Sequence, residues 1–186
     1  MKLILIRHGI AEDIFEADSD EERKLTADGT KKFKKISSGL IKAEPQIDQV
    51  IASPLVRAIQ TAEILIQKLQ INKFKDSELT LSSRIQAADN LIPEKLTELK
   101  PNANPIAFCN WLKTNFSNDE SFTLAAVGHE PHLSALLSFL LTGRAENIFE
   151  FKKGGAACLE LYFRPADIKA QLLWFMKPSH LRSLES

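Results

Sequence analysis

The chain has 186 residues, of which 44% are apolar, and its 24 basic and 24 acidic side chains cancel. This length suits one core, so we expect a single domain over residues 1–186. The balanced charge argues against a nucleic-acid or anionic-membrane partner, no apolar run is long enough for a membrane span, and two distant cysteines predict neither a disulfide framework nor a zinc site. We therefore expect a cytoplasmic protein.

The opening apolar run, residues 2–6, ends at Arg7-His8-Gly9. Aliphatic and β-branched residues that stop at a glycine predict a buried strand. Ligands of open α/β sheets bind at the carboxyl ends of strands. There a guanidinium can bind phosphate or carboxylate, a neutral imidazole can act as nucleophile or proton carrier, and Gly9 lets the backbone approach a ligand. By itself, such a triplet is more often a loop with a salt bridge.

The acidic stretch from Glu12 to Glu22 has no clean helical period and predicts a loop at the mouth of this site. The loop is either a solvated surface or a device that controls which anions enter. Thr26 follows as the expected N-cap of a helix that runs through Ile41.

Residues 48–53 predict a second short strand, and Pro54 suits the first turn of the helix that follows. Ser53 is then the expected N-cap. The free N–H groups at the start of this helix form an anion site, to which Arg57 adds a formal charge. Ser53 is either a plain cap or a phosphate ligand, and the sequence does not separate these roles.

Residues 73–105 mix polar and apolar side chains and contain three prolines, so we interpret them as a candidate excursion over the site. A helix is expected around residues 106–112. Residues 122–127 then predict a third strand, which stops at Gly128 and is followed by His129 and a new helix after Pro131. Two apolar runs, 156–163 and 170–176, predict a hairpin at one edge of the sheet.

Arg7, His8, Arg57 and His129 would bring two guanidiniums and two imidazoles to neighbouring strand ends, which suits a phosphoryl group. The arginines can bind its oxygens, one neutral imidazole can attack phosphorus in line, and a protonated second imidazole can neutralise charge. This chemistry needs no metal or other cofactor. A metal site with His132 as a third ligand is disfavoured because two arginines would repel the ion and no carboxylate completes the shell.

Cys158 and Arg164 have the spacing of cysteine phosphatases. The residues between them alternate as a strand does and lack the small residues of a phosphate-binding loop. We interpret the spacing as a coincidence, and Cys109 as part of the core.

Four motifs in order resemble the signatures of a known family. They are Leu5-Ile6-Arg7-His8-Gly9, Leu25-Thr26-x-x-Gly29, Ser53-Pro54-Leu55-x-Arg57-Ala58-x-Gln60-Thr61-Ala62 and Val127-Gly128-His129-Glu130-Pro131. They resemble the histidine phosphatase superfamily, also called phosphoglycerate-mutase-like. The short chain, the Gly-His-Glu-Pro motif and the Lys-Gly-Gly before the terminal hairpin most resemble its SixA-type phosphohistidine phosphatases.

The resemblance implies an α/β fold, a three-layer α/β/α sandwich with a mixed, mostly parallel central sheet. It implies that His8 becomes phosphorylated, that Arg7, Arg57 and His129 bind the phosphoryl group, and that water then hydrolyses the phosphoenzyme. Many members of the wider family also use a Glu or Asp of the middle stretch to protonate the leaving group. The candidates for that acid, which the sequence does not rank, are Glu78, Asp89, Glu94 and Glu98.

The need for this acid depends on the substrate, because an alkoxide leaves poorly without a proton and a phosphohistidine imidazole leaves far better. We therefore expect a metal-independent phosphohydrolase acting on a phosphohistidine-bearing phosphotransfer protein. One alternative is a small-molecule phosphomonoesterase or mutase, with Lys152 and Lys153 holding a second anion. Another is a catalytically silent phosphoprotein-binding module. His132 and His180 are expected at the surface.

Overall fold

A single sheet organises the chain in the computed structural model, which describes residues 1–75, 93–116 and 121–185. Within these ranges the sheet has six strands in the order β3-β2-β4-β1-β5-β6. The strands are β1 (Lys2–Arg7), β2 (Gln49–Ala52), β3 (Glu94–Lys95), β4 (Thr123–Gly128), β5 (Ala156–Phe163) and β6 (Ile168–Met176). The runs expected to form strands at 2–6, 48–53, 122–127 and 156–163 all lie in this sheet.

The first strand lies in the middle of the sheet, between one parallel and one antiparallel neighbour. β1 pairs in parallel with β4, with Arg7 opposite Gly128, and antiparallel with β5. β2 is parallel to both β4 and β3, whereas β6 is antiparallel to β5 at the edge. The sheet is therefore mixed and mostly parallel, and the terminal hairpin closes one edge, as predicted.

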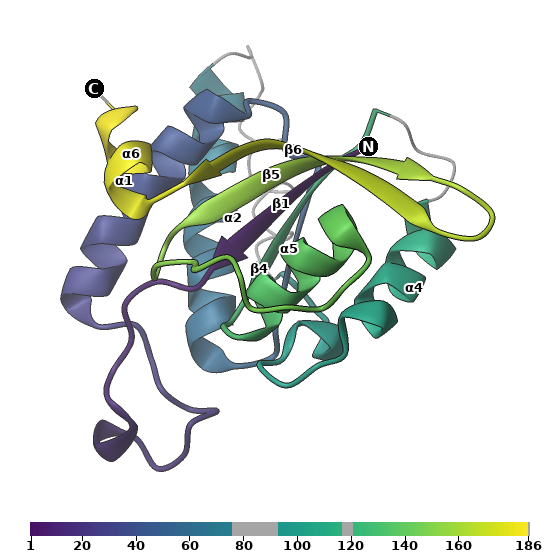
Figure 1. The fold of residues 1–186 in the computed structure, drawn as a ribbon. Coiled ribbons are helices and arrows are strands. Elements are labelled where there is room, and N and C mark those ends of the chain that lie inside the picture. Colours follow the sequence, from purple (N-terminus) through teal and green to yellow (C-terminus); the bar gives the residue numbers. More distant parts are fainter. Residues whose placement is uncertain (76–92, 117–120, 186) are drawn as a thin grey trace.

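Helices cover both faces of the sheet, so the predicted three-layer α/β/α sandwich is confirmed (Figure 1). On one face lie α1 (Ala27–Ala43), α2 (Val56–Lys75) and α6 (Pro178–Ser183). On the other lie α4 (Pro105–Phe116) and α5 (His132–Thr142). Ile4 and Ile6 of β1 pack under the first set, and Leu3 and Leu5 under the second. Burial on both faces explains why β1 is apolar throughout rather than alternating.

α1 starts where the sequence predicts, and α2 does not. The Thr26 hydroxyl accepts a hydrogen bond from the Gly29 N–H at 2.9 Å, as an N-cap does. The second helix begins at Val56, two residues later than expected, so Ser53 is not its N-cap. The Val56 N–H instead donates to the carbonyl of Glu21 at 3.1 Å, so the acidic stretch supplies the partner that a cap would supply.

The expected excursion over residues 73–105 lies largely outside the described residues. Its described part includes the short edge strand β3 and a 3-10 turn, η2 (Thr97–Leu99). The acidic stretch contains another 3-10 turn, η1 (Ile14–Glu16), within a segment that projects from the rest of the molecule at the lower left of Figure 1. Within the described ranges, no helix has the length and apolarity needed to cross a membrane.

Candidate active site

His8 follows the last residue of β1 and is held through its backbone by two neighbouring segments. Its N–H donates to the carbonyl of Gly128, at the end of β4, at 3.1 Å. Its carbonyl accepts a hydrogen bond from the Gly154 N–H at 3.0 Å. Gly154 has a φ of 80°, and a Cβ there would lie 2.7 Å from Ile36, so glycine suits both the turn and the packing. The position of His8 is therefore fixed between β4 and the turn before β5.

The side chain of His8 has the protonation state of a nucleophile. Its Nδ1 lies 2.7 Å from the carbonyl oxygen of Gly9, which can only accept, so Nδ1 carries the hydrogen and Nε2 keeps its lone pair. Burial lowers the pKa of His8 to about 3 despite this hydrogen bond, and the nearby charges of Arg57, Arg7 and Lys153 lower it further. The imidazole is therefore neutral near pH 7 and can attack through Nε2.

His129 follows β4 and faces His8. The two ring centroids are 4.9 Å apart, and His129 is 1% exposed. Neither ring nitrogen of His129 has a hydrogen-bond partner among the described residues. Burial, with the charges of His8 and Arg57, lowers its pKa to about 2. His129 is therefore neutral in the protein without ligand, and its protonation beside a bound phosphoryl group stays a prediction. A bound phosphoryl dianion would raise this pKa, because it adds negative charge beside the ring.

Arg7 is oriented by a chain of contacts from the Gly-His-Glu-Pro motif. Its Nη1 donates to the carbonyl of Phe151. The Glu130 carboxylate accepts from the Phe151 N–H at 3.0 Å and from the Ser134 hydroxyl at 2.7 Å. Glu130 thus fixes the backbone group that Arg7 binds, a contact the sequence motif does not reveal.

Arg57 lies in the first turn of α2, is 4% exposed and pairs with the acidic stretch. Its Nη2 donates to the Asp20 carboxylate at 2.9 Å, and its Nη1 donates to the Asp20 carbonyl. Burial alone would raise the pKa of Asp20, but hydrogen bonds from Arg23 and Arg57 hold that pKa below its usual value. The ionised Asp20 carboxylate therefore already accepts a hydrogen bond from the Arg57 guanidinium, which is predicted to bind phosphate.

Thr61 links the two halves of the site. Its hydroxyl oxygen accepts from the Gly9 N–H at 3.0 Å, and its hydroxyl donates to the Arg57 carbonyl at 2.6 Å. A Cβ on Gly9 would lie 3.2 Å from Leu25, so packing against Leu25 also favours glycine there. Ser53 is fully buried at the end of β2, and its hydroxyl accepts a 3.5 Å contact from the Leu55 N–H. A phosphate-binding role for Gly9 and Ser53 stays a prediction.

Of the four candidate acids, the two that the structure describes, Glu94 and Glu98, make their contacts away from this constellation. Glu78 and Asp89 lie outside the described residues. Glu94 is exposed on the edge strand, where it accepts a hydrogen bond from Gln49 at 2.8 Å, and Glu98 pairs with the Thr97 hydroxyl at 3.0 Å. Within the described part of the chain, no group of three or more His, Cys, Asp or Glu residues could hold a metal ion.

Two further expectations concern residues outside the constellation. Cys158 is fully buried on β5, and burial with the charge of Glu44 raises its pKa to about 12, so its thiol is a poor nucleophile. Cys109 is a core residue, as expected. His132, the first residue of α5, is 2% exposed rather than at the surface, whereas His180 is exposed.

Comparisons with known proteins agree with this geometry. The family model of the histidine phosphatase superfamily (branch 1) matches residues 3–83, which include Arg7, His8 and Arg57. A solved structure of the protein histidine phosphatase SixA complexed with tungstate superimposes with a TM-score of 0.73 and 25% identity, covering 97% of this chain and 99% of that one. The chain belongs to the histidine phosphatase superfamily.

Two relatives extend the comparison beyond the solved structure. An uncharacterized protein of Picosynechococcus sp. is 29% identical over 157 residues, which cover 83% of this chain and 82% of that protein. The mitochondrial serine/threonine-protein phosphatase Pgam5 of Drosophila persimilis is 38% identical over 73 residues, which are 39% of this chain and 25% of that protein. The superfamily member described here is a phosphatase whose fold is of the SixA type.

Proposed function

We propose that this phosphatase removes the phosphoryl group from phosphohistidine on a protein, through a phosphoenzyme on His8. The observation that carries the proposal is the state of His8, a buried, neutral imidazole with Nδ1–H directed to Gly9 and Nε2 free. The SixA resemblance over nearly the whole chain supports the same substrate class.

The chemistry needs two steps. First, the lone pair of His8 Nε2 forms a bond to phosphorus while the P–N bond of the substrate breaks. The substrate ring leaves as a neutral imidazole, because its second nitrogen takes a proton from solvent before the P–N bond breaks. Water then attacks phosphorus and the bond to Nε2 breaks, which returns that electron pair to His8; both protons of the water leave with the product as dihydrogen phosphate. Arg7 and Arg57 stabilise the charge on the phosphoryl oxygens in both steps.

The described carboxylates around the site fit this substrate better than an ester. Asp20, which contacts Arg57, is held ionised by its two arginine partners and so does not carry a proton for a leaving alkoxide near pH 7. A phosphohistidine has no need of that proton donor.

Phosphate release from two substrates tests the proposal. One substrate is an isolated histidine phosphotransfer domain phosphorylated with phosphoramidate, and the other is para-nitrophenyl phosphate, both with EDTA present. We expect fast release from the domain, slow release from the ester, loss of both in His8→Ala and no change in the exposed His180→Ala. Fast ester cleavage with an inert phosphodomain, or activity that survives His8→Ala, would contradict the proposal.

A small phosphomonoester with a second anionic group is the second candidate, favoured by one pocket. This pocket has a volume of about 210 Å³ and is lined in part by Gly9, the residue that follows His8 in the chain. The basic side chains that line it are Lys32, Lys153 and Arg182. Lys152, in contrast, pairs with Glu150 at the surface. This second function is favoured if the enzyme hydrolyses a bisphosphorylated small molecule faster than the phosphorylated domain, and if Lys153→Ala lowers the rate on that small molecule.

A further inference from the structure

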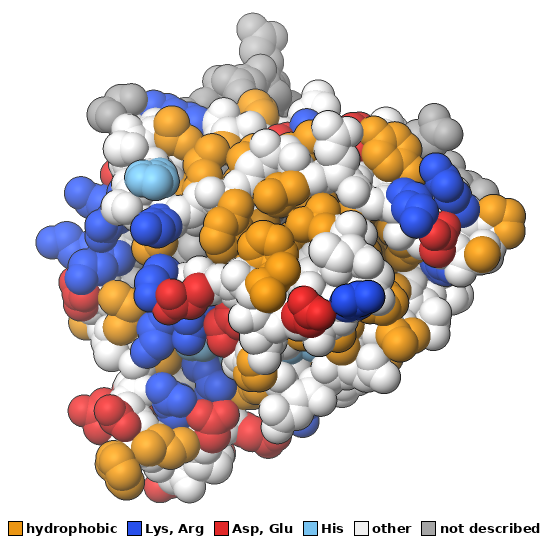
Figure 2. All heavy atoms as spheres, in the orientation of Figure 1, with side chains coloured by type: hydrophobic (Ala, Val, Ile, Leu, Met, Phe, Trp, Pro, Cys, Tyr) orange, Lys and Arg blue, Asp and Glu red, His pale blue; other side chains and the backbone are white. Residues whose placement is uncertain are grey.

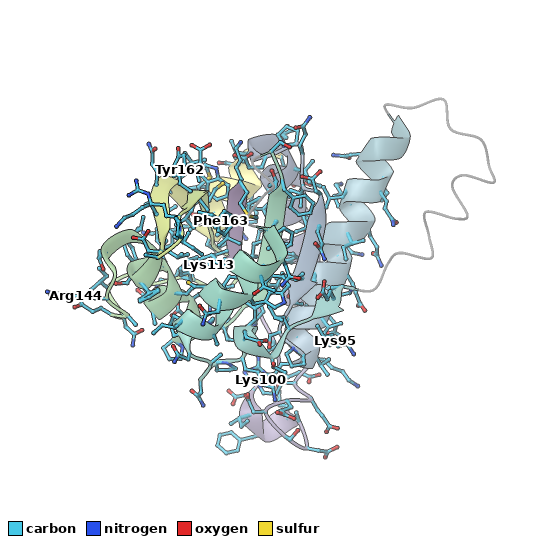
Figure 3. All side chains as sticks on the ribbon, turned by 90° about the vertical axis from the view of Figure 1, so that its right-hand side faces the viewer. Lys95, Lys100, Lys113, Arg144, Tyr162 and Phe163 are labelled. Atoms are coloured by element: carbon cyan, nitrogen blue, oxygen red, sulfur yellow. The ribbon has the colours of Figure 1, made fainter. Side chains whose placement is uncertain are left out.

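The acidic stretch belongs to an arm, residues 11–25, whose attachment to the body is well defined. At its base, Ala11 and Leu25 form an antiparallel bridge, and the Glu12 N–H donates to the Lys24 carbonyl at 2.9 Å. Its returning limb is fixed to the active site through the Asp20–Arg57 ion pair described above. Glu21 also pairs with Lys100 at 3.2 Å, and Figure 3 shows Lys100 directly beside the arm. The arm therefore has a defined position next to the catalytic residues.

The tip of the arm presents two apolar side chains on an ordered turn. Phe15 is 95% exposed and Ile14 is 43% exposed. Both lie in η1, which is closed by a capping box: the Asp13 side chain accepts from the Ile14 N–H at 2.6 Å, and the Glu16 side chain accepts from the Asp13 N–H at 2.9 Å. An exposed aromatic ring on a turn that is already ordered loses little entropy on binding, which is a property of interface hot spots.

The outer part of the arm, residues 12–22, carries only negative charge, although the whole chain is neutral and Arg23 and Lys24 follow at the end of the arm. From residue 12 to residue 22 there is no basic side chain. The acidic ones are Glu12, Asp13, Glu16, Asp18, Asp20, Glu21 and Glu22. Figure 2 shows the projection at the lower left with apolar and acidic side chains together, next to a group of basic ones. Such a surface repels anionic lipid and attracts a protein surface that is apolar at its centre and basic around it.

We propose that the arm is the docking site for the protein that carries the phosphohistidine. Phe15 would enter an apolar recess on that protein, and the partner's basic side chains would contact the acidic arm. The phosphoryl group would then enter between Arg7 and Arg57. This inference rests on the proposed function and deepens it, because it makes the surface around the phosphohistidine part of what is recognised.

A comparison of two substrates with the same reacting bond tests this inference. The phosphorylated phosphotransfer domain carries both the phosphohistidine and a protein surface, whereas a short phosphohistidine peptide carries only the first. Phe15→Ala should raise KM for the domain by about 10-fold, with kcat little changed, and leave kcat/KM for the peptide at the wild-type value. Tyr162→Ala is the matched control, since Tyr162 is 49% exposed and lies at the opposite end of the molecule from the arm (Figure 3).

Charge reversal provides a second readout that does not depend on the tip. Asp18→Lys and Glu22→Lys, both exposed, should raise KM for the domain at low salt, with a smaller effect at high salt, and should spare the peptide. The inference is overturned if Phe15→Ala cleaves the domain like wild type, or if it slows hydrolysis of the peptide as much as hydrolysis of the domain. It is also overturned if light scattering shows that Phe15→Ala changes the oligomeric state, because the tip would then bind a second copy of the chain. A wild-type protein inactive on both substrates would instead refute the proposed function.

Discussion

Asp20 places a negative charge on the guanidinium that is expected to bind the phosphoryl group. Its carboxylate also accepts from Arg23 at 2.8 Å, so it lies between two arginines at the mouth of the site. An entering phosphoryl group must displace this carboxylate from Arg57 or share the guanidinium with it. The same ion pair keeps the charge of Arg57 compensated in the absence of substrate.

Replacing Asp20 with asparagine should therefore strengthen oxyanion binding. In Asp20→Asn the competing charge is gone, and we expect the Kd for tungstate to fall by about 3- to 10-fold. Isothermal titration calorimetry measures this directly. Asp18→Asn, an exposed neighbour on the same arm, should leave the Kd unchanged. A higher Kd in Asp20→Asn would show that Asp20 orients Arg57 for the ligand rather than competing with the ligand for Arg57.

Site residues that directly follow a strand are easier to predict from the sequence than site residues whose partners are brought close only by tertiary packing. Arg7, His8 and His129 each stand at the end of an apolar run, and the parallel pairing of β1 with β4 brings them together. Asp20 and Thr61 carry no such signal, because their partners Arg57 and Gly9 are chosen by how the arm and α2 pack. The neutral state of His129 likewise depends on burial, which no local pattern reports.

The contact between α2 and the end of β1 depends on one hydroxyl. Thr61 is fully buried and satisfies both the Gly9 N–H and the Arg57 carbonyl. It therefore connects the strand that positions His8 with the helix that carries Arg57. The geometry between the nucleophile and one of the phosphate-binding residues is set at this junction of two elements.

Removal of this hydroxyl should reduce stability and activity together. Thr61→Val keeps the shape but leaves the buried Gly9 N–H without a partner, so we expect a loss of about 1–3 kcal/mol in the free energy of unfolding. Because His8 and Arg57 lose their link, kcat should also fall. Urea unfolding and steady-state kinetics measure the two effects. Thr61→Ser, which retains the hydroxyl, should restore most of both; a serine variant as impaired as the valine variant would refute the role of the hydrogen bonds.

Element boundaries were predictable where the cap is local and not where it comes from elsewhere. Thr26 precedes α1 in the chain and caps it, as predicted. α2 starts two residues later than the sequence predicts, because the Glu21 carbonyl, distant in sequence, accepts from the Val56 N–H. The two-residue strand β3 has an exposed pattern and gives no periodic signal, so its place beside β2 was not predicted.

Three buried histidines make the stability of the whole molecule depend on pH. Burial lowers the pKa of His8 to about 3, of His129 to about 2 and of His132 to about 4, against 6.5 for an exposed histidine. Between those values and pH 6.5 the unfolded chain binds protons that the folded chain does not bind. The free energy of unfolding therefore falls as the pH decreases from 7 toward 4.

His132 gives the cleanest test of this dependence, because it lies outside the catalytic constellation. From pH 7 to pH 5, a histidine that stays neutral in the fold removes about 1–2 kcal/mol of stability. His132→Leu should therefore lose less stability than wild type over this interval, by about that amount, in urea unfolding at the two pH values. His180→Leu, an exposed control, should match wild type. Equal losses in His132→Leu and wild type would mean that His132 already titrates normally in the folded protein.

The three-layer arrangement brings the ends of β1 and β4, the start of α2 and the turn before β5 together around His8. We expect His8 to become phosphorylated there during the reaction. We would mix the enzyme with one equivalent of the phosphorylated phosphotransfer domain and stop the reaction with neutral denaturant after several different intervals. Mass spectrometry would then identify the phosphorylated residue. We expect a transient phosphoryl group on His8 and none in His8→Ala. Phosphate release without any phosphoenzyme, or a phosphoryl group on another residue, would contradict it.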